Sequence, residues 1–360
     1  MISIATRTAG HVRFHDALLA VVLLLVTQAL PALEQPDQVL DEALVIGEQP
    51  GPGLWKVTKG DNVLWVLPNY GPLSKEMTWH PQQMQARIAE SQEVIYPPNV
   101  NVYPSIGLFH ALTLLPSLLK VGKNPDGATL QQVLPPDLYA RWVVVREKYV
   151  LAKNVEDLEA WRPGVAVMQL QGAALARNGL IYGRVDSFVS ATAKKNKIRL
   201  HRLPSLNRAV KVEHPRDMLN SARKVQQPEL GCFIRVLDAI EPDVERAKAR
   251  ANAWSRGDIP KLRELYREYP RSNDCIFALL TGFTELENAD ASRAKKILAD
   301  AEWHDQQGRV QSQRDWVAAA QLALQKNRST FAVLPVGDVL LPGGHLEKLR
   351  ELGYTVEEPL

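Results

Sequence analysis

The sequence lacks the short motifs that mark most hydrolases and nucleotide-binding enzymes. It contains no HExxH zinc motif, no GxSxG nucleophile turn, no phosphate-binding loop and no dinucleotide glycine fingerprint. A zinc or manganese hydrolase needs three or four convergent His, Asp or Glu ligands. Beyond residue 32 no two histidines have the spacing of a ligand pair; they are His80, His110, His201, His214, His304 and His345. Sequence motifs therefore identify no catalytic centre.

The chain also has little excess charge. Its formal net charge is +3 over 360 residues, whereas a dedicated nucleic-acid-binding protein is usually more basic. The most basic stretch, residues 194–216, contains no aromatic residue on which a base could stack. It is more typical of a solvated helix end and loop than of a patch for an anionic polysaccharide or a membrane surface. We expect no nucleic-acid partner.

The N-terminus has the pattern of an export signal. Basic residues precede the apolar run from Ala17 to Val26, and cleavage is predicted after Ala32, so residues 1–32 form the signal peptide. A membrane-spanning helix needs about 20 apolar residues, and this run is shorter, which favours a cleaved signal over an uncleaved anchor. Residues 33–52 are acidic and contain several prolines, as in a mobile leader. The expected location is periplasmic or secreted, with no membrane span after cleavage.

Only two cysteines are present, Cys232 and Cys275. In an exported protein they can form a disulfide. It would close a loop of about 44 residues and stabilise the fold by about 4 kcal/mol on the chain-entropy model. The alternative is two buried free thiols in facing helices.

Two stretches far apart in the sequence have strong structural patterns. Residues 331–354 predict a buried strand over Phe331 to Val336, a tight loop, and an amphipathic helix from His345 that ends at Gly353. The simplest interpretation is a terminal β-α unit that closes a core, although ligands of α/β proteins bind beyond the carboxyl ends of such strands. Residues 54–67 predict a hairpin whose second strand is nearly all apolar and therefore central in a sheet.

Together these stretches resemble the TraB/GumN family (the Tiki-like proteins). In that family each of two strands ends in a GxxH motif whose histidine binds a metal. Here Pro68-Asn69-Tyr70-Gly71 occupies the first motif and Val336-Gly337-Asp338-Val339-Leu340 lies over the second, with Leu340 in place of the histidine. The resemblance spans residue 54 to the C-terminus, and the segment AWSRGD followed by LRELY (residues 253–266) is similar to the family's helical midsection. The resemblance implies the fold but not the chemistry.

We therefore expect a single α/β domain over residues 53–360, following the signal and leader. A central, mostly parallel or mixed sheet is flanked by helices, and a large all-helical section, about residues 205–327, precedes the C-terminal strand. Within it the pattern predicts separate helices over 294–303 and 316–324. Earlier helices are predicted around 81–92, 106–119, 129–150, 164–175 and 185–193, with strands at 94–96 and 198–203.

The functional hypothesis is a catalytically degenerate family member that binds an envelope protein, peptide or glycan and needs no cofactor. The candidate crevice is formed by the two motif segments: Pro68, Asn69, Tyr70, Gly71, Gly337, Asp338, Leu340, Gly343 and His345.

Two alternatives remain open. One is a metal-dependent peptidase or other hydrolase that holds Zn or Mn with the substitute ligands Asp338, His345 and His80. For Asp338 a turn or helix cap, and for His345 a surface position, are the simpler structural roles. The other alternative is a helical interaction module built on residues 229–326.

Overall fold

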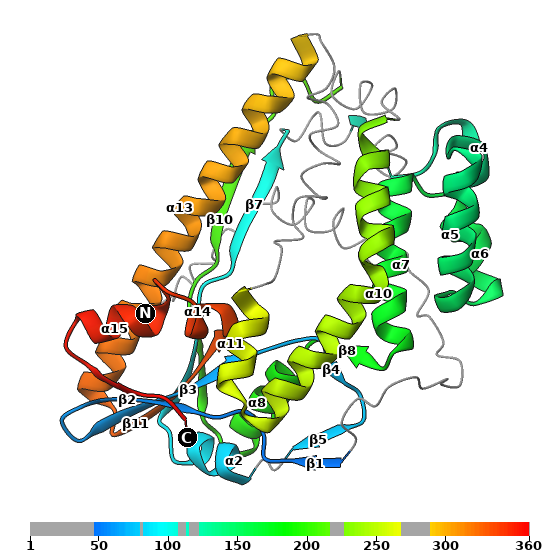
Figure 1. Ribbon diagram of the computed structural model, residues 1–360. Helices are drawn as coiled ribbons and strands as arrows, with labels where there is room; N and C mark the ends of the chain where they lie inside the picture. Colours follow the sequence, from blue (N-terminus) through cyan, green and yellow to red (C-terminus); the bar gives the residue numbers. More distant parts are fainter. Residues whose placement is uncertain are drawn as a thin grey trace, which may run out of the picture.

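The computed structural model describes residues 47–79, 82–106, 113–114, 122–216, 227–267 and 289–359. The predicted signal peptide, most of the leader, the helix predicted over 106–119 except residues 106, 113 and 114, and the residues His80, His110 and Cys275 lie outside these ranges. The chain forms a mixed α/β structure in which helices flank a six-stranded sheet (Figure 1). The predicted fold class is confirmed.

The sheet has the strand order β12-β2-β3-β11-β6-β9. Strands β2 and β3 are antiparallel, as are β12 and β2, whereas β11 runs parallel to both β3 and β6, and β6 runs parallel to β9. The six strands are β2 (Trp55–Lys59), β3 (Asn62–Asn69), β6 (Glu93–Tyr96), β9 (Arg199–Arg202), β11 (Ser329–Pro335) and β12 (Thr355–Glu357). Strands β3 and β11 lie at the centre because their nearly continuous apolar sequences suit burial on both faces.

The predicted hairpin is confirmed as β2 and β3. Lys59 pairs with Asn62, so two residues form the turn, and Gly60 at its first central position has a φ of +65°. A positive φ at this position is what a type II′ turn requires, and glycine adopts it without strain.

Helices pack around this sheet and around each other. The long helix α13 crosses β3, β11 and β6, and α2 contacts β11 and α8. The helices are α2 (Gln82–Ala89), α4 (Leu130–Val133), α5 (Pro136–Tyr149), α6 (Ala152–Glu159), α7 (Pro163–Arg177), α8 (Arg184–Lys195), α10 (Gln227–Arg256), α11 (Ile259–Arg267), α13 (Ala289–Lys326), α14 (Val336–Leu340) and α15 (His345–Glu351), with a 3-10 turn at Pro125–Gly127. In the described part of the chain, none of them is both long and apolar enough to cross a membrane.

A two-stranded parallel ribbon extends β6 and β9 beyond the sheet. Strand β7 (Val100–Ser105) pairs with β10 (Leu206–Lys211), and the ribbon runs beside α13 away from the sheet (Figure 1). Its register continues that of β6 and β9 across the intervening prolines. A Cβ at Gly308 of α13 would lie 2.4 Å from Val100 Cγ1, so a glycine permits this close contact. The remaining strand pairs are short: β1 (Gly47–Gln49) with β5 (Met77–Trp79), and β4 (Leu73–Ser74) with β8 (Leu180–Ile181).

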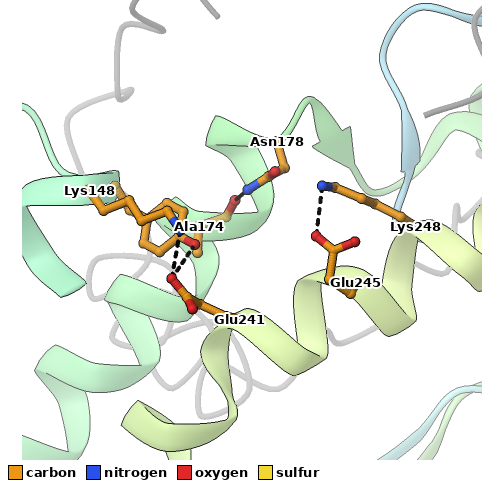
Figure 2. Close-up of polar contacts among 7 residues, drawn as sticks. Lys148, Ala174, Asn178, Glu241, Glu245 and Lys248 are labelled. Carbon is orange, nitrogen blue, oxygen red and sulfur yellow. Dashed lines mark hydrogen bonds and ion pairs between the residues drawn. The ribbon is translucent and has the colours of Figure 1, made fainter. Parts of the chain in front are cut away.

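A second hydrophobic cluster lies between α4, α5, α6, α7 and the first half of α10. The rings of Trp142 and Phe233 are 5.5 Å apart at its centre. At its margin Lys148 donates a hydrogen bond of 2.7 Å to Glu241 of α10 (Figure 2). This hydrogen bond raises the pKa of Lys148. The first half of α10 thus packs against helices, while its second half joins the sheet's core.

The structure corrects three predictions of local structure. The loop predicted after β11 contains the short helix α14, and the strand ends at Pro335 rather than Val336. The two helices predicted over 294–303 and 316–324 are one helix, α13, which continues through the polar residues between them beside the β7–β10 ribbon. Strand β10 lies within the section that was expected to be all-helical from about residue 205, because it pairs with β7, about a hundred residues away. Helix α10 in the same section continues through Pro242.

Candidate functional site

The two motif segments leave the sheet side by side. In the parallel pair of β3 and β11, Pro68 is opposite Leu334 and Asn69 is opposite Pro335. Both strands therefore end at the same edge, and α14 contacts β3. The carboxyl edge of parallel strands is where open α/β folds bind ligands.

The first motif segment is packed against neighbouring side chains, and its polar groups form hydrogen bonds. The indole Nε1 of Trp254, a residue that is 1% exposed, donates to the Pro68 carbonyl over 2.8 Å. The Asn69 amide donates to Asp186 at 3.3 Å, and the Tyr70 hydroxyl donates to the Ala247 carbonyl at 3.3 Å. Tyr70 is itself buried. This segment is closed by packed aromatic rings.

Tyr266 of α11 connects the two segments. Its ring meets that of Tyr70 edge-on, with centroids 6.2 Å apart. A Cβ at Gly337 would lie 3.9 Å from Tyr266 Cε1. The guanidinium of Arg250, a buried residue, lies 5.8 Å from the Tyr266 ring. Tyr266 and Trp254 were not predicted as site residues; the signal that could have identified them is the segment over residues 253–266, which contains both.

The two positions of the motif histidines hold no metal ligand. A Cβ at Gly71 would face Tyr182 Cδ1 at 3.2 Å. Leu340 is buried in the same hydrophobic core as Tyr70. An apolar side chain and a glycine contribute no donor atom from a side chain.

The second motif segment contains buried polar atoms without partners. His345 is 5% exposed and Trp316 of α13 is fully buried. Neither ring nitrogen of His345, nor the indole nitrogen of Trp316, has a hydrogen-bond partner among the described residues. The two rings meet edge-on with centroids 5.3 Å apart. Burial lowers the pKa of His345 to about 4, so the imidazole is neutral at physiological pH.

Asp338 is the carboxylate nearest to this histidine. Its Oδ2 lies 3.9 Å from His345 Nδ1, which is too long for a hydrogen bond. Burial raises the pKa of Asp338, and the positive charge of Arg309 only partly opposes the increase. His345 was expected at the surface, and the structure buries it instead.

The glycine loop between α14 and α15 brings these residues together. A Cβ at Gly344 would lie 2.3 Å from the Asp338 carbonyl oxygen, so no larger residue fits at this turn. The Gly343 carbonyl accepts a hydrogen bond of 2.6 Å from Gln313 of α13, and its N–H donates to Glu347. Gly343 itself has a φ of +73°.

The residues present do not fit the metal site that the resemblance implies. Within the described ranges no three His, Cys, Asp or Glu side chains converge as a metal site would require. Of the three substitute ligands, Asp338 and His345 are neighbours, and His80 lies outside the described residues.

Cys232 is fully buried in α10. Cys232 is disulfide-bonded rather than a free thiol. The predicted partner of Cys232, Cys275, lies outside the described ranges, so the pairing of these two residues stays a prediction.

Comparison with known proteins identifies the family of this chain. No curated protein and no solved structure matches the chain. The family model described as the TraB/PrgY/gumN family matches residues 53–358, which include both motif segments and the helices between them. The chain belongs to the TraB/PrgY/gumN family.

Proposed function

We propose that this chain is an exported, non-catalytic member of its family that binds an envelope protein, a peptide or a glycan. The binding surface is the crevice between the segments at 68–71 and 337–343. The observation that carries the proposal is the pairing of β3 with β11, which brings both motif segments to one edge while Gly71 and Leu340 stand at the histidine positions. The fold thus supplies a site in which the expected ligands are replaced.

The physical argument concerns the strength of the remaining donors. Imidazole nitrogens bind zinc and manganese in these sites, and a set reduced to one histidine and one carboxylate loses most of its affinity. The atoms of the first segment are moreover engaged in hydrogen bonds within the core. Reactivity at this edge would have to come from the second segment alone.

Metal analysis of the purified full chain tests the absence of catalysis. After incubation with zinc or manganese and dialysis, we expect substoichiometric metal by mass spectrometry and no peptide hydrolysis. One metal ion per chain that is lost in Asp338→Ala but retained in Asp300→Ala, a control on the exposed surface of α13, would overturn the proposal.

Photo-crosslinking in cells tests the binding surface. A photoreactive residue at Gly337, where an added Cβ meets no atom closer than 3.8 Å, should form adducts with a partner. The same residue at the exposed Leu352 is the control and should not. Equal adducts at both positions, or none at Gly337, would contradict binding in the crevice.

Export has its own test. A mature chain that begins at Leu33 in an extracytoplasmic fraction, measured by mass spectrometry, is the expected result. An intact N-terminus would contradict a cleaved signal.

A specific observation favours a second candidate function. The buried, unpartnered nitrogens of His345 beside Asp338 suit a hydrolase that uses these side chains as a metal-binding or proton-transferring pair. Hydrolysis that requires His345 but survives Trp316→Phe would favour this candidate, because the Trp316 variant alters the neighbouring ring and leaves the imidazole in place.

A further inference from the structure

A cavity of about 390 Å³ lies away from the crevice, between α13 and the edge of the sheet. It includes Glu93 at the start of β6 and Arg199 at the start of β9. Glu93 precedes Val94, which pairs with Phe331, whereas the crevice begins four residues further along β11 at Pro335. At about 3.3 Å per residue the two sites are about 13 Å apart along the strand.

The wall formed by α13 is apolar and has one charged end. Residues 319, 322, 323 and 326 all line the cavity, and their spacing places them on one face of the helix. Ala319 contributes little volume, and Leu322 is 48% exposed. Helix α13 packs on β3, β11 and β6, so its last turns lie over the outer part of the sheet. The space remains because an alanine faces it.

The opposite wall carries a carboxylate whose two oxygens are both occupied. Asn327 donates to Glu93 Oε1 at 3.0 Å, and Arg199 donates to Oε2 at 2.7 Å. His201 Nδ1 is a further 3.3 Å from Oε2. Burial alone raises the pKa of Glu93, but the hydrogen bonds and the positive charge of Arg199 outweigh burial and hold the pKa below its usual value. Both carboxylate oxygens of Glu93 are therefore hydrogen-bonded within the protein, and the charge of Arg199 offsets that of Glu93.

Arg199 and Lys326 keep hydrogen-bond donors and positive charge that Glu93 does not engage. Arg199 has five N–H donors, and its side chain is 69% exposed while one nitrogen contacts Glu93. Lys326 is exposed and forms no ion pair with any residue that the structure describes. With Glu93 neutralised by Arg199, Lys326 leaves an excess of positive charge at one end of an apolar wall.

We infer that this cavity binds a small amphiphile with one anionic group, a carboxylate or a phosphate, next to Lys326 and Arg199, and an apolar body on Leu322. The volume is within the range of small-molecule sites, about 300–1,000 Å³. The site is independent of the crevice, so it stands whether or not the function proposed above is correct.

Binding of octyl compounds to the purified full chain tests the inference. Isothermal titration calorimetry should detect octanoate or octyl phosphate, and the stronger of the two identifies the anionic group. Octylamine should bind up to about fivefold more weakly, since the attraction of a partly exposed charge is worth up to about 1 kcal/mol. Equal affinity for anionic and cationic compounds, or no binding of any of them at millimolar concentration, would overturn the inference.

Two variants locate the site. Lys326→Gln should weaken binding of the anionic compound about fivefold, whereas Lys295→Gln, an exposed lysine on the same helix, should leave it unchanged. Ala319→Phe places a ring in the cavity and should abolish binding, and circular dichroism checks that this variant is folded. Unchanged affinity in a folded Ala319→Phe protein, or equal effects of the two lysine variants, would exclude this cavity as the binding site.

Discussion

The two motif segments lie side by side at one edge of the sheet, but they differ in whether their polar atoms are hydrogen-bonded. In the first segment Trp254, Asn69 and Tyr70 each donate a hydrogen bond to a defined acceptor. In the second, the ring nitrogens of His345 and Trp316 are buried with no partner among the described residues. One segment is a satisfied part of the core, and the other retains unused hydrogen-bonding capacity.

The difference has an energetic consequence. A buried polar atom without a partner costs about 1–3 kcal/mol relative to one that is hydrogen-bonded. The first segment therefore contributes to stability, while the second reduces it unless a bound group supplies the missing contacts. We therefore expect a group bound at this edge to contact His345 rather than Tyr70.

The largest predicted loss of stability comes from removing Trp254, which is hydrogen-bonded to the first segment. Trp254→Ala removes a fully buried indole and its hydrogen bond to Pro68. It should lower the free energy of unfolding by about 3–5 kcal/mol, measured by urea denaturation. Trp303→Ala, at a tryptophan that is 57% exposed, should change it by less than about 0.5 kcal/mol. Equal effects would mean that the first segment is not a packed core.

The next largest predicted effect is a pH dependence of the free energy of unfolding that arises from His345 in the second segment. The pKa of His345 is lowered from 6.5 to about 4, so the unfolded chain binds a proton between these values while the folded chain does not. The neutral imidazole's contribution to stability is therefore complete above pH 6.5 and is lost as pH falls toward 4. The loss is about 3 kcal/mol.

Unfolding measured across this pH range in the wild type and in His345→Phe isolates the histidine. The raised pKa of Asp338 acts in the opposite direction at the acidic end of the range, because its folded state binds a proton first. It is present in both proteins and cancels in the difference to first order. If the two proteins lose stability equally on acidification, His345 is not buried as described.

The glycine loop of the second segment should show a smaller effect. Gly344→Ala drives a Cβ against the Asp338 carbonyl oxygen and should cost about 1–3 kcal/mol in thermal or urea unfolding. Gly172→Ala within α7, where an added Cβ meets nothing within 4 Å, should instead stabilise by about 0.5–1 kcal/mol. A neutral Gly344→Ala would show that the loop is not held against α14.

The smallest effect tests one hydrogen bond of the first segment. Tyr70→Phe keeps the ring against Tyr266 and removes the hydroxyl that donates to Ala247. The expected loss is about 0.5–1.5 kcal/mol in urea denaturation. A stabilised variant would contradict the view that this segment's polar atoms are all satisfied.

Local sequence predicted the elements whose patterns are self-contained. The hairpin from Trp55, the buried strand around Phe331 and the helix from His345 each have their own apolar periodicity and a glycine at the point of termination or turn. The family assignment followed from these elements because they carry both motif segments. Patterns within a few residues are enough for such elements, since the hairpin turn and the helix form local hydrogen bonds and the strand is marked by its own apolar run.

Boundaries that depend on distant packing were not predicted. The polar middle of α13 indicates a break, but the helix continues beside the β7–β10 ribbon. The ribbon itself has no strong alternation and depends on the pairing of segments about a hundred residues apart. No local pattern contains that information.

The sequence alone determined that two strands end in family motifs and that neither motif contains its histidine. Only the tertiary structure decided that Trp254 and Tyr266 close the first segment, that His345 is buried against Trp316, and that a cavity remains beside Lys326. The physical reason is that a side chain's identity is local, whereas its burial and its hydrogen-bond partners depend on helices that reach the site from distant parts of the chain.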